Sequence, residues 1–508
     1  MGPLTLSGRK PQLILTFVSL IAAPGSWTLA EEAASSDRDE WHKLFLAGAL
    51  AGHMRIVERQ LADGGFVTTM MQKLVLKRDT TVLETEATSS VEEDREGRIR
   101  GFSVRQRLSS QASEVVGRLV GADLEITEDD GGPGPGSKKT PRRSRLPSDP
   151  TAVGPHRMER ILDEKLRTAG DSVQLRVFIP ELRKFGLQKS SLEAEETVEL
   201  DGTRQKLRRI RSTLDLLAEI PTLQWIDPAG NLQKSTMPLL GTELKTLRST
   251  MAEILKSDLT SPPEIFLATS VPVEGRVDPS RNHITYKITA KKKAMPFEGN
   301  RKLFPAAGQE ELRPGTRQER WLRVKRVPHG NPLQLPISPA PELEEYLRPN
   351  AWIQSDDELI RAAARKAQGG ETDAVQVSIK LESWVHDTIA RKNLGTAFAS
   401  AREVLHEKEG DCTEHAVLLA ALLRAIGVPS RVVAGLVYYN GMFVGHMWTE
   451  AYLRDWFPLD ATQARGFVGP DHIALSVSSL DAATVADIFL DIVPVIGSVT
   501  IEVVESGE

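Results

Sequence analysis

The sequence contains very little cysteine: one residue, Cys412, in 508. A single cysteine cannot form a disulfide within the chain, which excludes a scaffold held together by disulfides. The sequence also has no pair of cysteines or histidines at zinc spacing, no EF-hand loop and no glycine-rich phosphate loop. We therefore predict neither a metal ion nor a cofactor.

No excess of one charge is present either. Lys and Arg total 64, Asp and Glu total 69, and the formal net charge is -5. This balance gives no overall electrostatic reason to expect a nucleic-acid partner. One basic cluster, "KKTPRRSR" at 138–145, could touch an anionic surface or be a solvated loop.

Long apolar runs are missing outside the N-terminus. There, Arg9 and Lys10 precede the apolar run Leu13–Ala23, and "TLA" ends at Ala30. This run is shorter than the ~20 residues of a membrane-spanning helix and has the order of a signal peptide. We expect residues 1–30 to be removed, leaving a mature chain that is exported to the periplasm or outside the cell and has no membrane span. In that setting, Cys412 is either a buried inert side chain or a reactive thiol.

Composition and periodicity predict the domain order. Residues 31–127 alternate apolar and polar side chains, as in "GFSVRQRL", and predict an N-terminal β-rich unit. The Gly, Pro and charge content of 128–150 predicts an unstructured connector. A second β-rich unit with helices, including a helical pattern at 242–257, covers 151–349. A catalytic domain follows at 350–475, and a strand-containing extension covers 476–508.

The predicted fold class is α+β. From about residue 351 the pattern is helical, and strand patterns return after about residue 430. This order predicts a C-terminal papain-like core with helices packed on an antiparallel sheet, preceded by the large β-rich N-terminal region. The sequence predicts no particular oligomeric state.

The stretch around Cys412 predicts the start of a helix. Asp411 and Glu414 have the spacing of a capping box, and Gly427 with Pro429 marks the end of the helix. Cys412 then lies on the first turn, where free N–H groups and the positive end of the helix dipole stabilise a thiolate.

A nucleophilic thiol needs a base, and the strand pair after this helix offers one. Asn440-Gly441 predicts a type I′ turn, and His446 lies on the second arm of that hairpin. The next strand, "WFPLDAT", carries Asp460. A three-residue loop, 453–455, would pair Tyr452 with Trp456 and bring Asp460 within reach of His446, whereas a two-residue turn would put it on the wrong face.

These motifs together resemble the transglutaminase-like superfamily of papain-type cysteine enzymes. The residues that carry the resemblance are "GDCTEHA", "GVPSR", "GHMWTEAYL" and "WFPLDAT", within roughly 370–475. The resemblance implies an exported, bacterial-type member with Cys412 as nucleophile, His446 as general base and acid, and Asp460 as the group that orients the imidazole. The tryptophan of the oxyanion hole in animal transglutaminases has no clear counterpart, and Trp384 falls in a helical stretch. The calcium of those enzymes likewise has no matching residues.

Other residues near the motif have structural alternatives. His415 lies one turn after Cys412 and is better explained as a packing or supporting residue than as the base. His386 and His406 lie in helical stretches, and nothing in the sequence positions His472. Trp448 and Trp456 are core aromatics in one interpretation, while in another Trp448 lines the substrate groove.

The sequence therefore predicts an exported cysteine-dependent amide acyltransferase or hydrolase acting on a protein or peptide amide through a thioester. A cysteine peptidase or amidase on the same scaffold is the alternative among enzymes. A non-catalytic binding or scaffold protein is the alternative from another class. The role of the β-rich region 31–345 stays open.

Overall fold

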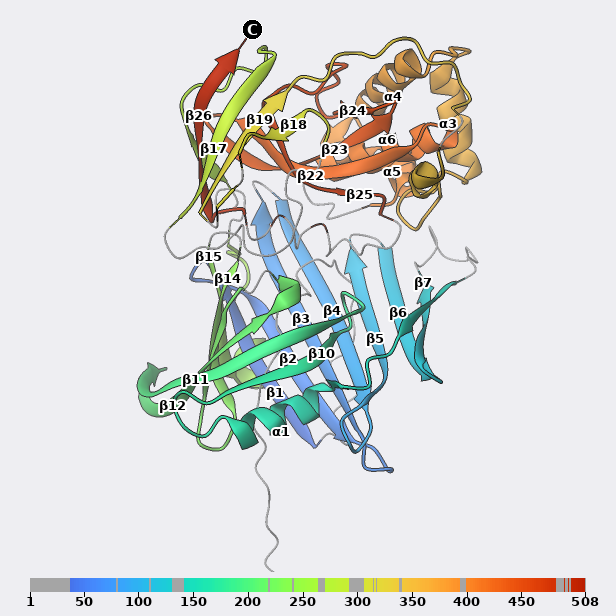
Figure 1. Cartoon of the computed structure of the whole chain (residues 1–508). Helices are drawn as coiled ribbons and strands as arrows, with labels where there is room; N and C mark the ends of the chain where they lie inside the picture. Colours follow the sequence, from blue (N-terminus) through green and yellow to red (C-terminus); the bar gives the residue numbers. More distant parts are fainter. Residues whose placement is uncertain are drawn as a thin grey trace, which may run out of the picture. The chain divides into compact units, whose positions relative to one another are not determined.

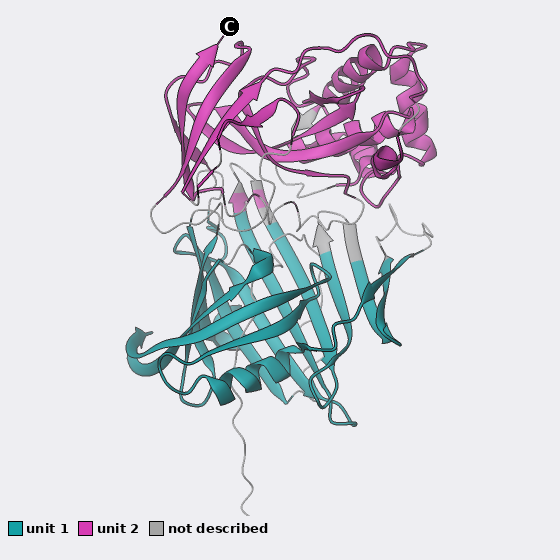
Figure 2. Cartoon of the chain, in the orientation of Figure 1, with its two compact units in different colours: residues 1–76, 84–132, 138–263 teal, residues 77–83, 133–137, 264–508 magenta. Residues whose placement is uncertain are grey.

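We describe a computed structural model of the chain, covering residues 37–507 except 79–80, 109–110, 130–140, 218–219, 240–241, 264–269, 292–305, 314, 317, 338–339, 393–398, 481–487, 489–491 and 493–494. The chain forms two compact units, shown in Figure 2. Unit 1 comprises residues 1–76, 84–132 and 138–263, and unit 2 comprises residues 77–83, 133–137 and 264–508.

The elements up to residue 263 are almost all strands. They are β1 (Arg38–Leu46), β2 (Ala49–Gln60), β3 (Phe66–Arg78), β4 (Thr81–Glu93), β5 (Ile99–Leu108), β6 (Gln111–Val120), β7 (Asp123–Asp129), β8 (Arg142–Pro147), β9 (Ala152–Val153), α1 (Pro155–Lys165), β10 (Ser172–Ile179), β11 (Lys184–Leu200), β12 (Thr203–Leu214), the 3-10 helix η2 (Asp215–Leu217), β13 (Thr222–Ile226), β14 (Leu232–Leu239), β15 (Thr242–Ser249) and α2 (Met251–Leu255).

These strands form one 15-stranded sheet that nearly closes on itself (Figure 1). Its order is β8-β7-β6-β5-β4-β3-β2-β1-β15-β14-β13-β12-β11-β10-β9. The terminal strand β9 returns to the start of β5, because Val153 forms a bridge with Arg98 and the Gly154 N–H donates to the Gly97 carbonyl over 2.8 Å. These two contacts connect the β9 end of the sheet to the start of β5.

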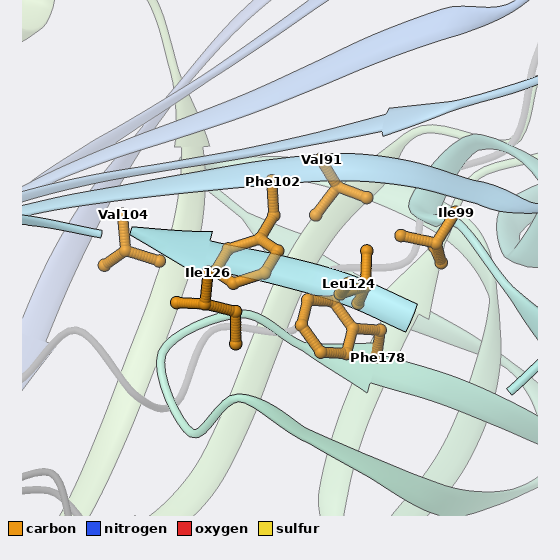
Figure 3. Packing of buried hydrophobic residues seen from close by; sticks show 7 residues of the cluster. All are labelled: Val91, Ile99, Phe102, Val104, Leu124, Ile126 and Phe178. Atoms are coloured by element: carbon orange, nitrogen blue, oxygen red, sulfur yellow. The ribbon is translucent and has the colours of Figure 1, made fainter. Parts of the chain in front are cut away.

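A hydrophobic cluster connects the two parts of the sheet that meet at this closure (Figure 3). Its buried members come from β4, β5, β7 and β10: Val91, Ile99, Phe102, Val104, Leu124, Ile126 and Phe178. The rings of Phe102 and Phe178 lie 4.9 Å apart in a tilted arrangement that aromatic pairs favour. Alternation places Phe102 and Val104 on one face of β5, as the period-two pattern of the sequence predicts, and likewise Leu124 and Ile126 on one face of β7.

Leu124 is fully buried in this cluster, so we expect Leu124→Ala to lower the free energy of unfolding of unit 1 by about 2–5 kcal/mol. The lost methyl groups leave a cavity that the surrounding strands cannot fill completely. Urea unfolding followed by tryptophan fluorescence measures the change. Leu119→Ala, at a side chain 39% exposed on β6, is the matched control and should change the unfolding free energy little. Equal effects of the two substitutions would contradict the cluster's role.

Unit 2 mixes strands with a group of helices. Its elements are β16 (Val271–Glu274), β17 (His283–Ala290), β18 (Gln309–Glu311), β19 (Glu319–Lys325), the 3-10 helix η3 (Pro341–Tyr346), α3 (Glu358–Gln368), α4 (Ala374–Thr388), β20 (Arg391–Lys392), α5 (Ala401–Glu407), β21 (Glu409–Gly410), α6 (Cys412–Ala425), β22 (Ser430–Tyr439), β23 (Met442–Tyr452), β24 (Trp456–Leu459), β25 (His472–Ser478) and β26 (Val499–Gly507).

The main sheet of unit 2 has nine strands in the order β18-β19-β17-β26-β16-β23-β22-β25, with β24 paired to β23. Helix α6 contacts β22 and β23 on one side and α3, α4 and α5 on others (Figure 1). Two hydroxyl groups bind this helix to the sheet: Thr449 Oγ1 donates to the Ala416 carbonyl and Ser430 Oγ to the Ala420 carbonyl. The first part of α6 is therefore bonded to β23 and its middle to β22.

The predicted α+β fold class is wrong. Strands predominate in the described parts of both units, and the largest feature is the nearly closed 15-stranded sheet. The helical pattern at 242–257 shows one cause of the error, because Thr242–Ser249 is strand β15 and only Met251–Leu255 is helix. Strand pairing between distant segments overrides such local patterns.

The compact units divide the chain differently from the predicted domains. Strands β16–β19 and β26 share one sheet with β22–β25, although the sequence predicts that these three groups belong to separate domains. Arg142–Pro147, predicted as connector, forms strand β8 and pairs with β7. The predicted signal peptide, 1–30, lies outside the described residues. Among the described helices, none is long and apolar enough to cross a membrane.

Candidate active site

Cys412 is the first residue of α6, as the capping-box motif predicts. The Asp411 carboxylate accepts the Thr413 N–H over 2.9 Å, and the Glu414 carboxylate accepts the Asp411 N–H over 2.8 Å. Glu414 also accepts the Ala399 N–H over 2.9 Å, which connects the helix start to the segment before α5. The thiol of Cys412 is half-buried at this fixed helix terminus.

The strands that carry His446 and Asp460 have the predicted register. Asn440 and Gly441 have φ angles of 47° and 87°, which a type I′ turn requires. Tyr452 pairs with Trp456 across the three-residue loop, and Thr449 pairs with Leu459. Asp460 comes directly after β24. This register places its side chain on the same face of the sheet as His446.

The structure brings Cys412, His446 and Asp460 together in series. The side chain of Cys412 lies close enough to the His446 ring to favour the charged form of the imidazole. His446 Nε2 donates to Asp460 Oδ2 over 3.0 Å, which leaves Nδ1 as the ring nitrogen for the thiol. This is the order nucleophile, base and orienting carboxylate that covalent catalysis requires.

The electrostatic environment keeps His446 protonated. Burial opposes the charged form, but the charge and hydrogen bond of Asp460, together with Cys412, outweigh it and raise the pKa of His446 to about 10. Asp460 is buried as well, and burial alone would favour its neutral form. The neighbouring His446 and His472 nevertheless hold the pKa of the Asp460 carboxyl well below its usual range.

Both oxygens and the backbone of Asp460 are held by hydrogen bonds. Asp460 Oδ1 accepts from the backbone N–H and the hydroxyl of Thr462, over 2.9 and 2.6 Å. The Asp460 N–H donates to Glu382 of α4 over 2.8 Å, and Glu382 also accepts the Gly466 N–H over 2.8 Å. Burial raises the pKa of Glu382 to about 7 against these hydrogen bonds. Helix α4 thereby positions the loop that carries Asp460.

His472 is a site residue whose position the sequence did not predict. As the first residue of β25, it donates from Nε2 to Asp460 Oδ2 over 3.3 Å and from Nδ1 to Asp471 Oδ1 over 3.0 Å. Asp471 Oδ2 in turn accepts from Arg465 over 3.1 Å. Strand β22 lies between β23 and β25, and its Gly435 pairs with both His446 and Ala474. A Cβ at Gly435 would lie 2.2 Å from the Ile473 carbonyl oxygen, so glycine permits this close packing.

The other histidines of the motif region lie around this series rather than in it. His415 Nδ1 donates to the Asp411 carbonyl over 2.6 Å, and burial lowers the pKa of the His415 ring. His386 Nδ1 donates to the Ala461 carbonyl over 3.0 Å. The His406 side chain is 80% exposed and contacts Glu407.

The tryptophans have different surroundings. Trp448 is buried in a cluster with Val433, Val468 and Ala474, and its ring packs edge-on against His472. Trp456 contacts Tyr346 and Tyr452 edge-on. Trp384 lies on α4 and is half-buried.

Within the described ranges, one group of His, Cys, Asp or Glu residues is spaced closely enough to share a metal ion. It consists of His446, Asp460 and His472, whose donor atoms all lie within 4.8 Å of one another. The hydrogen bonds among these side chains account for that spacing without an ion.

The raised pKa of His446 predicts a pH-dependent stability. The ring titrates near 6.5 when unfolded and at about 10 when folded, so its contribution is fully present below pH 6.5 and is lost as the pH rises to about 10. We expect unit 2 to lose up to about 5 kcal/mol of unfolding free energy across that range, and His446→Gln to lose much less. Urea unfolding at several pH values measures both. Parallel curves for the two proteins would contradict the raised pKa.

Comparison with known families identifies this part of the chain. Residues 361–461 match the model of the transglutaminase-like superfamily, over about a fifth of the chain and including Cys412, His446 and Asp460. The chain therefore contains a transglutaminase-like domain, and members of this superfamily are usually cysteine enzymes. The resemblance predicted from the sequence is confirmed for this stretch.

Two solved structures are similar to parts of the chain. A "putative cysteine protease" from Cytophaga hutchinsonii is 19% identical, with a TM-score of 0.28, over 44% of this chain and 86% of that one. A β-barrel-like protein of a domain of unknown function from Brucella abortus is 13% identical, with a TM-score of 0.31, over 42% and 95%. Scores this low carry no argument about function. No curated protein matches the sequence.

Proposed function

We propose that the protein is a cysteine-dependent enzyme that cleaves or transfers the acyl group of a protein or peptide amide. The observation that carries the proposal is the placement of Cys412 beside His446, whose ring is hydrogen-bonded to Asp460 and whose pKa is raised by both neighbours. In this series Cys412 is the nucleophile, His446 is the general acid and base, and Asp460 orients the ring.

The chemistry follows from the charges of the pair. The Cys412 thiolate attacks the amide carbon, a C–S bond forms, and the carbonyl electron pair moves onto oxygen. The tetrahedral intermediate then expels the amine, whose nitrogen takes a proton from His446, which leaves a thioester. Water or a second amine, losing a proton to His446, attacks the thioester and releases the thiolate.

The N-terminus of α6 supplies one donor for the negative oxygen of the intermediate. The Cys412 backbone N–H lies on the first turn of the helix, where it has no partner within the helix. We assign it to the oxyanion, whose charge the helix dipole also favours.

An amine-incorporation assay tests the proposed function. The full chain is incubated with a library of peptides and a labelled primary amine, and the products are followed by mass spectrometry. Incorporation of the amine indicates acyl transfer, deamidation or peptide cleavage indicates hydrolysis, and hydroxylamine should capture the thioester. All of these products should vanish in Cys412→Ala. If wild type and Cys412→Ala both yield none of them, the chain is a binding or scaffold protein instead.

We also propose that the protein is exported and that residues 1–30 are removed on export. The charged start, short apolar run and small residues before Glu31 support this. Expression in a secretion-competent host, followed by N-terminal sequencing, should give a mature chain starting at Glu31. An intact N-terminus on a chain retained in the cytoplasm would contradict export.

A further inference from the structure

The environment of His472 specifies its charge. Its two ring nitrogens each face a carboxylate oxygen, Nε2 toward Asp460 and Nδ1 toward Asp471. An ionised carboxylate can only accept a hydrogen bond, so each of these contacts requires a proton on the ring nitrogen. Both carboxylates have a lowered pKa despite their burial, and so both are ionised. A ring that donates from both nitrogens is an imidazolium, and His472 is therefore a buried cation.

This cation completes a row of alternating charges behind the thiol. The row starts at Cys412, which acts as a thiolate in the function proposed above, and runs through His446, Asp460, His472 and Asp471 to Arg465, whose side chain is 36% exposed. Asp460 Oδ2 thus accepts from two imidazolium rings, whose centroids lie 5.6 Å apart. Each buried charge in the row has an opposite charge on both sides, which is the arrangement that makes burial of ions tolerable.

The remaining titratable groups near the row do not duplicate the role of His472. Helix α4 contributes Glu382, which bonds to the Asp460 backbone rather than to its carboxylate, and His386, which bonds to a carbonyl. Helix α6 contributes His415, whose pKa is lowered by burial, and the capping carboxyls of Asp411 and Glu414.

Tyr286 of β17 donates to the Pro470 carbonyl next to Asp471. Within the described residues, His472 is the second cation hydrogen-bonded to Asp460.

We propose that His472 is a positioning residue that stays cationic, fixes the Asp460 carboxylate and offsets its charge, so that the charge of His446 remains available to the Cys412 thiolate. The proposal rests on the function proposed above for Cys412 and adds a residue to it. Asp471 and His472 lie beyond the stretch that matches the family model, 361–461, so the assignment comes from this structure alone.

The charge of His472 can be observed without any substrate. In protein labelled with ¹⁵N-histidine, NMR distinguishes a ring with two N–H groups from a neutral ring with one. The signals of the His472 ring are those that disappear from the spectrum of His472→Gln. We expect this ring to keep both N–H protons from about pH 6 to well above pH 6.5, the ordinary pKa of histidine. In Asp471→Asn, its titration should move down toward that value. A neutral His472 ring in the wild type at pH 7 would overturn the proposal.

The effect on the thiol is measured by the rate of iodoacetamide alkylation against pH. In His472→Gln, Asp460 loses the cation that offsets its negative charge. The midpoint of the alkylation profile should therefore lie ~0.5–1 pH unit above that of the wild type, and alkylation below the midpoint should be ~3–10-fold slower. His386→Gln makes the same substitution outside the row and should leave the midpoint unchanged. A His472→Gln protein that melts earlier but keeps the wild-type midpoint would show a merely structural residue and overturn the proposal.

The same measurement separates this inference from the proposed function. If the wild-type thiol already reacts like a free cysteine, with a midpoint near 8.5, the function proposed for Cys412 fails and the inference fails with it. If the wild-type midpoint is low and His472→Gln leaves it unchanged, only the role of His472 is refuted.

Discussion

Replacing Cys412 with alanine should abolish turnover of the amide substrate, by ~10⁴-fold or more, while the protein stays folded. The thiol is the group that we expect to form the covalent bond, and no second cysteine exists in the chain to replace it. The Cys412 side chain is half-buried and lies at a helix terminus, so its truncation should cost only about 1 kcal/mol of stability. Product formation in the amine-incorporation assay and the melting temperature are the two measurements.

Two further variants test whether the loss of turnover is due to the thiol itself. Cys412→Ser keeps the shape of the side chain with a poorer nucleophile, and should be as inactive as Cys412→Ala. His406→Gln changes a side chain that is 80% exposed on α5 and should retain wild-type turnover. Retained turnover in Cys412→Ala with a large drop in melting temperature would show that the cysteine contributes packing rather than chemistry.

Replacing His446 with alanine should make the thiol much less reactive near neutral pH. Below about pH 10 the His446 ring carries a positive charge beside the Cys412 side chain, and this charge favours the thiolate. Without it, the midpoint of the iodoacetamide alkylation profile should rise toward the ~8.5 of a free cysteine, which slows alkylation at pH 6.5 by ~30–100-fold. Asp460→Asn, which weakens the charge of His446 without removing the ring, should shift the midpoint less.

His415→Gln is the matched control for this shift. His415 is a buried histidine one helical turn from Cys412, but burial lowers the pKa of its ring and leaves it neutral. The same alkylation profile should therefore be close to that of the wild type. A shift in His415→Gln combined with none in His446→Ala would reverse the assignment of the base.

The parts of the site that depend on short-range signals could be predicted from the sequence. The capping box of Asp411 and Glu414 places Cys412 on the first turn of α6, and Asn440-Gly441 closes the hairpin. The loop before Trp456 follows from the requirement that Asp460 face His446. Each of these features is encoded within about fifteen residues, over which turn and cap chemistry dominates.

The parts that depend on distant segments could not be predicted. Glu382 lies 78 residues before Asp460, to whose backbone it is bonded, and no periodicity relates the two. His472 is bound between Asp460 and Asp471 because β25 pairs with β22, a neighbour that the sequence alone does not specify. The error in fold class has the same origin, since β17, β19 and β26 join the sheet of β22 and β23 from far along the chain.

Strand β26 lies between β17 and β16 in the sheet of unit 2, although it follows β17 by about two hundred residues. At synthesis rates of about 5–20 residues per second, β17 leaves the ribosome ~10–40 s before the strand that covers its open edge. Throughout that interval the nascent chain presents a hydrogen-bonding edge with apolar side chains, including Tyr286 and Ile288, that will later be buried. The sheet that carries His446 is thus completed only late in biosynthesis, when β26 pairs with the strand edges that β16 and β17 present.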